Sequence, residues 1–272
     1  MGRTLYLECY SGISGDMIVG ALLDLGADEE KLRKALASLP LDGYSIQISR
    51  VKKSGLLVCD FDVQLDAAHE NHDHDMAYLY GQMSVETSDT DTHPHQHAHH
   101  EHRNLEEITR IIRAADLSPK ATQYALKIFG ILAEAEAQVH GTSVEQVHFH
   151  EVGAVDSIVD IVAAAVCLDM LDVSEVIIPD LTEGRGCVRC QHGVIPVPVP
   201  AVLAITKRYG IALRITGIDG EMVTPTGAAF CAAVRTGTAL PEHMQVVQIG
   251  MGAGKRVYPN ATGILRALII TE

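Results

Sequence analysis

The chain has 272 residues, 47% of them hydrophobic, which is enough to bury a core in one large domain or two closely packed ones. Its formal net charge of −14 argues against nucleic acid and membrane surfaces as partners, because both carry negative charge. With no tryptophan and only four phenylalanines, the core must consist mainly of Ala, Val, Ile and Leu, which suits parallel or mixed sheets covered by helices.

Targeting and redox signals favour the cytoplasm. The six cysteines are scattered, as expected for reduced thiols in a chain that needs no disulfides. The N-terminus lacks the basic start and apolar run of a signal peptide, and the longest apolar run, residues 161–168, is too short to cross a bilayer. We therefore expect a cytoplasmic protein.

Residues 1–68 follow clear local patterns. Alternation of apolar and polar residues indicates strands, and a 3.6-residue apolar period indicates helices. Asp16 is expected to cap the first helix and Gly26 to end it. In chain order we expect a strand over 4–9, helices over 17–25 and 29–39, and a hairpin of strands 44–51 and 56–65.

Residues 69–102 differ from the rest of the chain. They hold nine of the 14 histidines and seven acidic residues, with no lysine or arginine. The segment shows no apolar periodicity, so it cannot bury enough surface to fold alone. We predict a disordered insertion, with residues 1–68 and 103–272 as the two parts of one α/β domain.

Helices and strands continue to interleave after the insertion. Residues 196–209 are expected to start extended, because of their prolines, and then to turn helical. Interleaving throughout predicts an α/β or intimately mixed α+β fold, with a mixed sheet covered by helices. We expect further helices over 104–115, 119–140, 153–171 and 224–236, and strands over 173–178, 211–216, 244–250 and 263–270.

The histidine-rich insertion is the strongest chemical signal. Neutral imidazole binds Ni, Cu, Zn and Co, and a flexible chain with closely spaced histidines can wrap such a cation. The alternatives are an expression tag or a solvating polar tract, but this tract is internal and mixed with Asp and Glu, which favours metal binding. The predicted ligands here are His69, His72, His74, His93, His95, His97, His99, His100 and His102.

A second cluster lies between residues 148 and 160. His148 and His150 project the same way if this stretch is extended, and Asp156 and Asp160 share one face of a helix. Asp160 stands among branched apolar residues, where a carboxylate requires a partner or a cation. Capping of a helix explains Glu151 or Asp156 but not the whole set. We therefore expect a metal site in which Glu151, Asp156 and Asp160 are candidate catalytic groups and His148, His150 and Glu151 are ligands.

Two weaker motifs leave alternatives open. The Cys187–Val188–Arg189–Cys190 motif fits a pair of semi-buried thiols as well as it fits a metal site, in which Cys190 and His192 would join the second cluster. The loop between the first strand and first helix fits an ordinary turn or a phosphate site. The same choice holds for residues 224–227. The candidate ligand-binding residues are Ser11, Gly12, Ser14, Gly15, Asp16, Thr224, Thr226 and Gly227.

Six blocks in the same order resemble the nickel-insertion proteins of nickel-pincer cofactor biosynthesis, which make the cofactor of lactate racemase. The resemblance covers essentially the whole chain. The blocks are LYLECYSGISGDMIVGALLDLG, EHRNLEEI after the histidine tract, VHFHEVGAVDSIVDIV, GRGCVRCQHGVIPVPVPA, TPTGAA and GMGAGKRVYPNATGILR.

The resemblance implies a cyclometallase, an enzyme of the lyase class. It inserts Ni²⁺ into pyridinium-3,5-bisthiocarboxylic acid mononucleotide and forms Ni–S bonds and one Ni–C bond. CTP hydrolysis with Mn²⁺ or Mg²⁺ accompanies insertion in this family, at a site in a C-terminal domain beyond these 272 residues. The resemblance therefore implies a CTP-binding C-terminal domain, either separately encoded or cut from this chain, and a lactate racemase-type recipient. It leaves homo-oligomerisation open.

Two other functions remain at this point. One is a nickel storage protein or metallochaperone without turnover of its own. The other is an unrelated phosphate-binding α/β enzyme with an incidental histidine tract.

Overall fold

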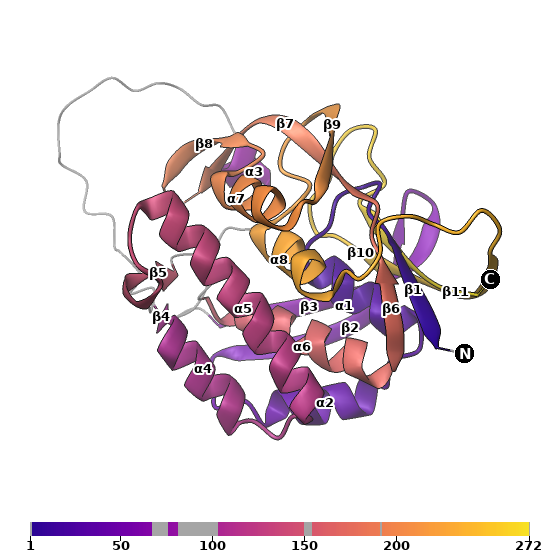
Figure 1. Ribbon diagram of the computed structural model, residues 1–272, viewed down its shortest axis with the longest axis horizontal. Helices are drawn as coiled ribbons and strands as arrows, with labels where there is room; N and C mark the ends of the chain where they lie inside the picture. The colour runs from indigo at the N-terminus through magenta and orange to yellow at the C-terminus, as the bar shows by residue number, and fades with distance from the viewer. Residues whose placement is uncertain (1, 67–75, 81–102, 150–153, 191, 272) are drawn as a thin grey trace.

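The computed structural model describes residues 2–66, 76–80, 103–149, 154–190 and 192–271. Its largest element is a six-stranded sheet to which both ends of the chain contribute (Figure 1). The β1–β6 and β3–β10 pairs are parallel and the other three are antiparallel, so the sheet is mixed, as predicted. In spatial order the strands are β2 (Tyr44–Lys53), β3 (Leu56–Leu65), β10 (Gln245–Ala253), β11 (Ile264–Thr271), β1 (Arg3–Glu8) and β6 (Val173–Ile177).

A second, three-stranded sheet lies at the top of Figure 1. Its central strand pairs in parallel with one neighbour and antiparallel with the other. The strands are β8 (Gly193–Val197), β7 (Asp180–Cys190) and β9 (Ala212–Asp219), and a short pair is formed by β4 (Arg103–Asn104) and β5 (His148–Phe149).

The helices confirm the mixed α/β fold. The longest of those described, α5, extends toward the β7–β8 hairpin (Figure 1). None of the helices in the described ranges is long and apolar enough to cross a membrane. The helices are α1 (Gly15–Asp24), α2 (Glu29–Ala37), α3 (Met76–Tyr80), α4 (Leu105–Ala114), α5 (Pro119–His140), α6 (Val155–Met170), α7 (Pro200–Tyr209) and α8 (Pro225–Val234), with a 3₁₀ turn at Val144–Gln146.

Helix α1 lies directly on the backbone of β10. A Cβ atom at Gly252 would stand 2.0 Å from the Met17 carbonyl oxygen, and one at Gly250 would stand 2.2 Å from that of Ala21. The apolar face of α1, including Ile18 and Leu22, is buried, and each such side chain contributes about 1.5–3 kcal/mol. This close contact fixes the start of α1 at the edge of the sheet, where the candidate site lies.

Three local predictions need correction. Helix α1 begins at Gly15, so its N-cap is Ser14 and Asp16 lies in the first turn instead of capping it. Strand β7 was missed, because its sequence is rich in glycine and polar residues and its pairing with β8 and β9 is tertiary. Residues 76–80, placed inside the predicted disordered insertion, form α3, and Leu79 there is buried.

Candidate functional site

A cavity of about 310 Å³ brings together most of those predicted site residues that the structure describes. It brings together the loop before α1, the start of α6, the end of β7 and the start of α8, which are far apart in sequence. Predicted residues that line it are Ser11, Ser14, Gly15, Asp16, Asp156, Asp160, Cys190, His192, Thr224 and Thr226.

The two remaining glycines of the predicted loops, Gly12 and Gly227, do not line the cavity but pack closely against the backbone of neighbouring segments. Gly12 has φ of +82°, and a Cβ there would stand 2.0 Å from the Met222 carbonyl oxygen. A Cβ at Gly227 would stand 2.3 Å from the Ile13 carbonyl oxygen. Both glycines are therefore required for close backbone packing, and their side-chain-free positions bring the starts of α1 and α8 together.

Four helix N-termini open into this cavity, those of α1, α6, α7 and α8. Ala154 and Val199, the N-caps of α6 and α7, have no polar side chain, so they cannot accept a bond from the first-turn N–H groups. Ser14, the N-cap of α1, donates its hydroxyl to Asp16 instead. Helix N-termini carry partial positive charge, and four of them directed at one space favour an anionic ligand.

The same cavity also contains the three carboxylates of Asp16, Asp156 and Asp160, whose negative charge contrasts with the positive helix N-termini. Gly15 lets Asp160 lie against the start of α1, because a Cβ there would stand 2.3 Å from Asp160 Oδ2. Burial raises the pKa of Asp160 well above its ordinary value, and the neighbouring Asp16 and Asp156 raise it further, while Lys255 acts in the opposite direction. Asp160 therefore holds its proton more tightly than an exposed aspartate, as is common for groups that transfer protons in active sites.

Lys255 and Arg256 line the cavity and were not singled out from the sequence. The Lys255 backbone N–H donates to Asp16 Oδ2 at 3.1 Å, and its ammonium pairs with Asp60 at 2.7 Å and with Asp62 at 3.1 Å. Arg256 forms an ion pair with Glu221. Burial opposes the charge of Arg256, but Glu221 outweighs burial and the pKa of Arg256 is raised. Both cations are thus held charged beside an otherwise acidic cavity.

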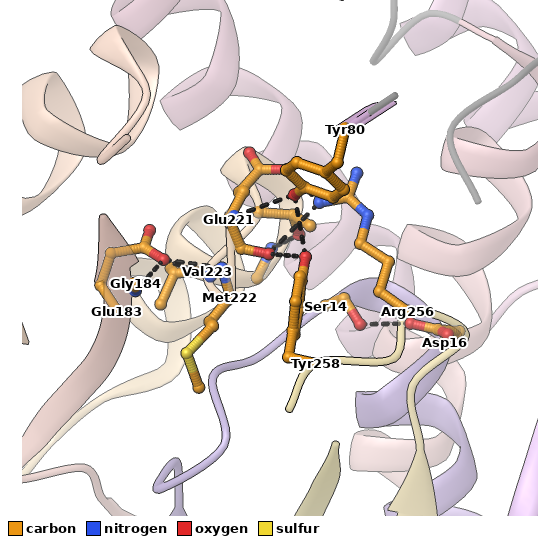
Figure 2. Close-up of polar contacts among 12 residues, drawn as sticks. Ser14, Asp16, Tyr80, Glu183, Gly184, Glu221, Met222, Val223, Arg256 and Tyr258 are labelled. Atoms are coloured by element: carbon orange, nitrogen blue, oxygen red, sulfur yellow. Dashed lines mark hydrogen bonds and ion pairs between the residues drawn. The ribbon is translucent and has the colours of Figure 1, made fainter. Parts of the chain in front are cut away.

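Figure 2 shows how Arg256 is connected to α3. The Tyr258 hydroxyl donates to the Glu221 carbonyl oxygen at 2.6 Å, and the Glu221 N–H donates to the Tyr80 hydroxyl oxygen at 3.0 Å. The two tyrosine hydroxyls lie 2.9 Å apart. Tyr80 therefore fixes α3 against the cavity wall through the backbone of Glu221.

The buried side chain of Glu183 in β7 fixes the backbone of the adjoining segment 220–224 by hydrogen bonds. It is fully buried, and its Oε1 accepts the backbone N–H groups of Gly184, Met222 and Val223 at 2.7, 2.7 and 3.2 Å (Figure 2). Its Oε2 is buried with no hydrogen-bond partner within the described part of the chain. Burial raises the pKa of Glu183 to about 7, although the three N–H donors lower it.

This pKa leads to a prediction about pH. The folded pKa of Glu183 is above the unfolded one, so the folded chain binds the proton more tightly, and the free energy of unfolding falls as pH rises from about 4.5 to about 7. Glu183→Gln keeps the acceptor oxygen and is expected to remove about 3 kcal/mol of that fall. Urea denaturation at pH 5 and pH 8 measures it.

The matched control for this substitution is Glu242→Gln, which changes an exposed glutamate far from β7 in sequence. Its unfolding free energy should follow that of the parent chain at both pH values. A Glu183→Gln chain that keeps the full pH dependence of the parent would show that this carboxyl group is not responsible.

The predicted metal ligands are only partly described. His148 lies in β5, paired with Asn104, and Cys190 and His192 stand on the β7–β8 hairpin with Sγ and Nδ1 3.8 Å apart. Across the described ranges, no three His, Cys, Asp or Glu side chains already surround one point. His150, Glu151 and all nine histidines of residues 69–102 lie outside the described residues.

Comparison with known proteins identifies the family. The family model described as nickel insertion protein matches residues 5–272. A pyridinium-3,5-bisthiocarboxylic acid mononucleotide nickel insertion protein from Alkaliphilus metalliredigens is 52% identical over 100% of the chain and 61% of its own length. One from Geobacillus kaustophilus is 42% identical over 99% of the chain and 60% of its own length.

A putative nickel insertion protein from Geobacter sp. is 40% identical over 98% of the chain and 61% of its own length. The chain thus spans about 60% of the length of these curated relatives. A comparison with solved structures found no match. Because the family model covers nearly every residue, including all the elements that build the cavity, the chain belongs to the nickel insertion protein family.

Proposed function

We propose that this chain binds pyridinium-3,5-bisthiocarboxylic acid mononucleotide in the cavity and inserts Ni²⁺ into it. The observation that carries the proposal is the convergence of four helix N-termini on one cavity. The mononucleotide carries a phosphate and two thiocarboxylates, which are the anionic groups that such N-termini bind. A cavity of about 310 Å³ is at the lower end of the range for small-molecule sites.

The phosphate is assigned to the start of α8. There Thr224 and Thr226 line the cavity at the positive end of the α8 dipole, and Arg256 lines the same cavity. The start of α1 suits a phosphate less well, because the Asp16 and Asp160 carboxylates lie there. Gly15 and Ser14 instead support the reacting end of the substrate, beside those carboxylates.

Asp160 is assigned as the acceptor of the ring proton. Formation of the Ni–C bond replaces a ring C–H bond, so one proton must leave as nickel bonds to that carbon. An arriving Ni²⁺ favours the ionised form of nearby carboxylates, and the raised pKa makes Asp160 a stronger base than an exposed aspartate. Asp156 lies one helical turn before Asp160 and supports the same charge balance.

The remaining roles extend beyond the described residues. We assign the histidine tract to collecting Ni²⁺ and the additional length of the relatives to the CTP site with its Mn²⁺ or Mg²⁺. The activity is then a cyclometallase of the lyase class, and the metallated nucleotide passes to a lactate racemase-type enzyme in the cytoplasm. Nickel storage or delivery without turnover is the alternative that the following experiment separates.

The test is calorimetric titration of the chain with the mononucleotide and, separately, with its nucleoside lacking the phosphate. The mononucleotide should bind at least tenfold more tightly, because only it presents a phosphate to the helix N-termini. Nicotinamide mononucleotide, which keeps the phosphate but lacks both thiocarboxylates, is the matched control and should also bind more weakly.

Turnover is measured in the same preparation by adding Ni²⁺, CTP and the C-terminal part of a full-length relative and following the absorbance of the metallated product. Equal binding of mononucleotide and nucleoside would contradict the phosphate assignment. Nickel binding without any affinity for the mononucleotide would favour storage or delivery.

A further inference from the structure

Four side chains with metal-ligand chemistry lie close together in the lining of the cavity. Cys190 and His192 come from the β7–β8 hairpin, and Glu136 and His140 come from the last turns of α5. All four line the cavity. His140 stands alone in the sequence, 50 residues before Cys190, so no spacing motif indicates that it belongs with the others.

The backbone explains why these side chains meet. Helix α5 ends at Gly141, which adopts the left-handed conformation with φ of +64°, so His140 is the last helical residue. The hairpin turn closes with Cys190 paired to Gly193, which has φ of +88°. The C-terminus of α5 and the end of β7 therefore place these polar side chains next to one another.

The distances divide the four groups into two pairs that face each other. His140 Nε2 lies 3.3 Å from Glu136 Oε2, and Cys190 Sγ lies 3.8 Å from His192 Nδ1. The two imidazole rings connect the pairs, with centroids 4.9 Å apart and planes tilted by 38°. In the described residues no three such groups already surround one point, so we expect side-chain rotation to bring both imidazoles and the thiol around a single ion.

We infer that His140, Cys190 and His192, with Glu136 orienting His140, form a docking site for Ni²⁺ before it is transferred to the mononucleotide. The inference rests on the proposed function and adds the entry point of the metal. Imidazole and thiolate are ligands that nickel accepts readily, and a carboxylate behind a ligating histidine fixes its orientation. The Cys190 thiol releases its proton to solvent as the S–Ni bond forms.

The open arrangement suits a metal that has to leave again. A closed site with four converging ligands would hold nickel against transfer, whereas two pairs that close only on the ion leave coordination positions for the thiocarboxylate sulfurs. His192 is exposed, so the site is accessible to incoming cation, while Cys190 is partly buried at the cavity wall. The metal therefore enters beside the bound substrate.

The experiment reads the sulfur–nickel charge-transfer absorbance of the chain titrated with Ni²⁺ alone. This signal avoids interference from the histidine tract, because residues 69–102 contain no cysteine. Only Cys187 and Cys190 among the six cysteines are not buried. We expect a band in the parent chain, its loss in Cys190→Ser, and its retention in the matched control Cys187→Ser.

A second pair of variants keeps both thiols. His140→Gln should raise the Ni²⁺ concentration for half-maximal absorbance at least tenfold, whereas His243→Gln, an exposed histidine outside the cavity, should leave it unchanged. Far-ultraviolet circular dichroism verifies that each variant is folded. The docking site is overturned if the parent shows no band, or if the band survives Cys190→Ser.

These outcomes are separable from failure of the proposed function. Phosphate-dependent binding of the mononucleotide without a charge-transfer band removes the docking site and leaves the proposed function intact. A band that responds to Cys190 and His140, in a chain that does not bind the mononucleotide, keeps a nickel site and removes the insertion activity.

Discussion

Replacing Asp160 with asparagine is expected to lower the rate of nickel insertion at least a hundredfold while mononucleotide binding stays unchanged or becomes tighter. The amide has nearly the shape of the carboxylic acid but cannot accept the ring proton, and positioned general bases contribute about 10²–10⁴-fold to rates. Binding should not weaken, because the neutral amide adds no negative charge to an anion-binding cavity. Initial rates of product absorbance and calorimetric affinities measure the two effects separately.

Asp169→Asn is the matched control, since Asp169 lies on the same helix, outside the cavity, where it accepts the Ser118 hydroxyl at 2.5 Å. It should keep the parent insertion rate. The Asp160→Asn chain should be at least as stable as the parent at pH 7, because burial disfavours ionisation of the natural acid. An insertion rate within fivefold of the parent would assign proton transfer to another group.

Gly252→Ala is expected to lower the free energy of unfolding by about 3 kcal/mol or more. The added methyl group would stand 2.0 Å from the Met17 carbonyl oxygen and 2.5 Å from the Ala21 nitrogen. Both are backbone atoms of α1, so the helix must move off β10, and overpacking of this kind costs about 1–3 kcal/mol even where side chains can yield. Urea denaturation monitored by circular dichroism gives the value.

Gly130→Ala adds the same methyl group but is expected to raise the free energy of unfolding. Gly130 lies inside α5, and a Cβ there meets no atom within 4 Å. Alanine is the better helix former, so stability should rise by up to about 1 kcal/mol. If the two variants unfold at the same urea concentration as the parent, the close contact between α1 and β10 is wrong.

Local pattern predicted most of the fold correctly. The hairpin of β2 and β3 and the long helix α5 were placed within two residues, because alternation and periodicity in these segments agree with their final burial. Strand β7 was missed because its DLTEGRG half has no alternating pattern, and it becomes a strand only through pairing with β9 and β8. Helix α3 was missed because five residues are too short for a periodic signal.

In the candidate site, too, sequence predicts residues in local motifs but not those whose role depends on tertiary contacts. Sequence reasoning identified Asp156, Asp160 and the loop before α1, whose motifs are local, and the structure brings them into one cavity. It did not identify Arg256 or His140, because each is a single residue whose meaning depends on distant partners. The convergence of helix N-termini was equally hidden, since it follows from the way α1, α6, α7 and α8 pack and from no single stretch of sequence.

The order of strands has a consequence for biosynthesis. Strands β10 and β11, which are synthesised after the other four strands of this sheet, fill the gap between β3 and β1, which come from the first quarter of these 272 residues. During synthesis, the β3 edge of the β2–β3 hairpin and the β11-facing edge of β1 therefore stay unpaired until residue 271 has left the ribosome. Such long-range closure is slow, and exposed edges invite aggregation, so the nascent chain is expected to depend on chaperones until the sheet closes.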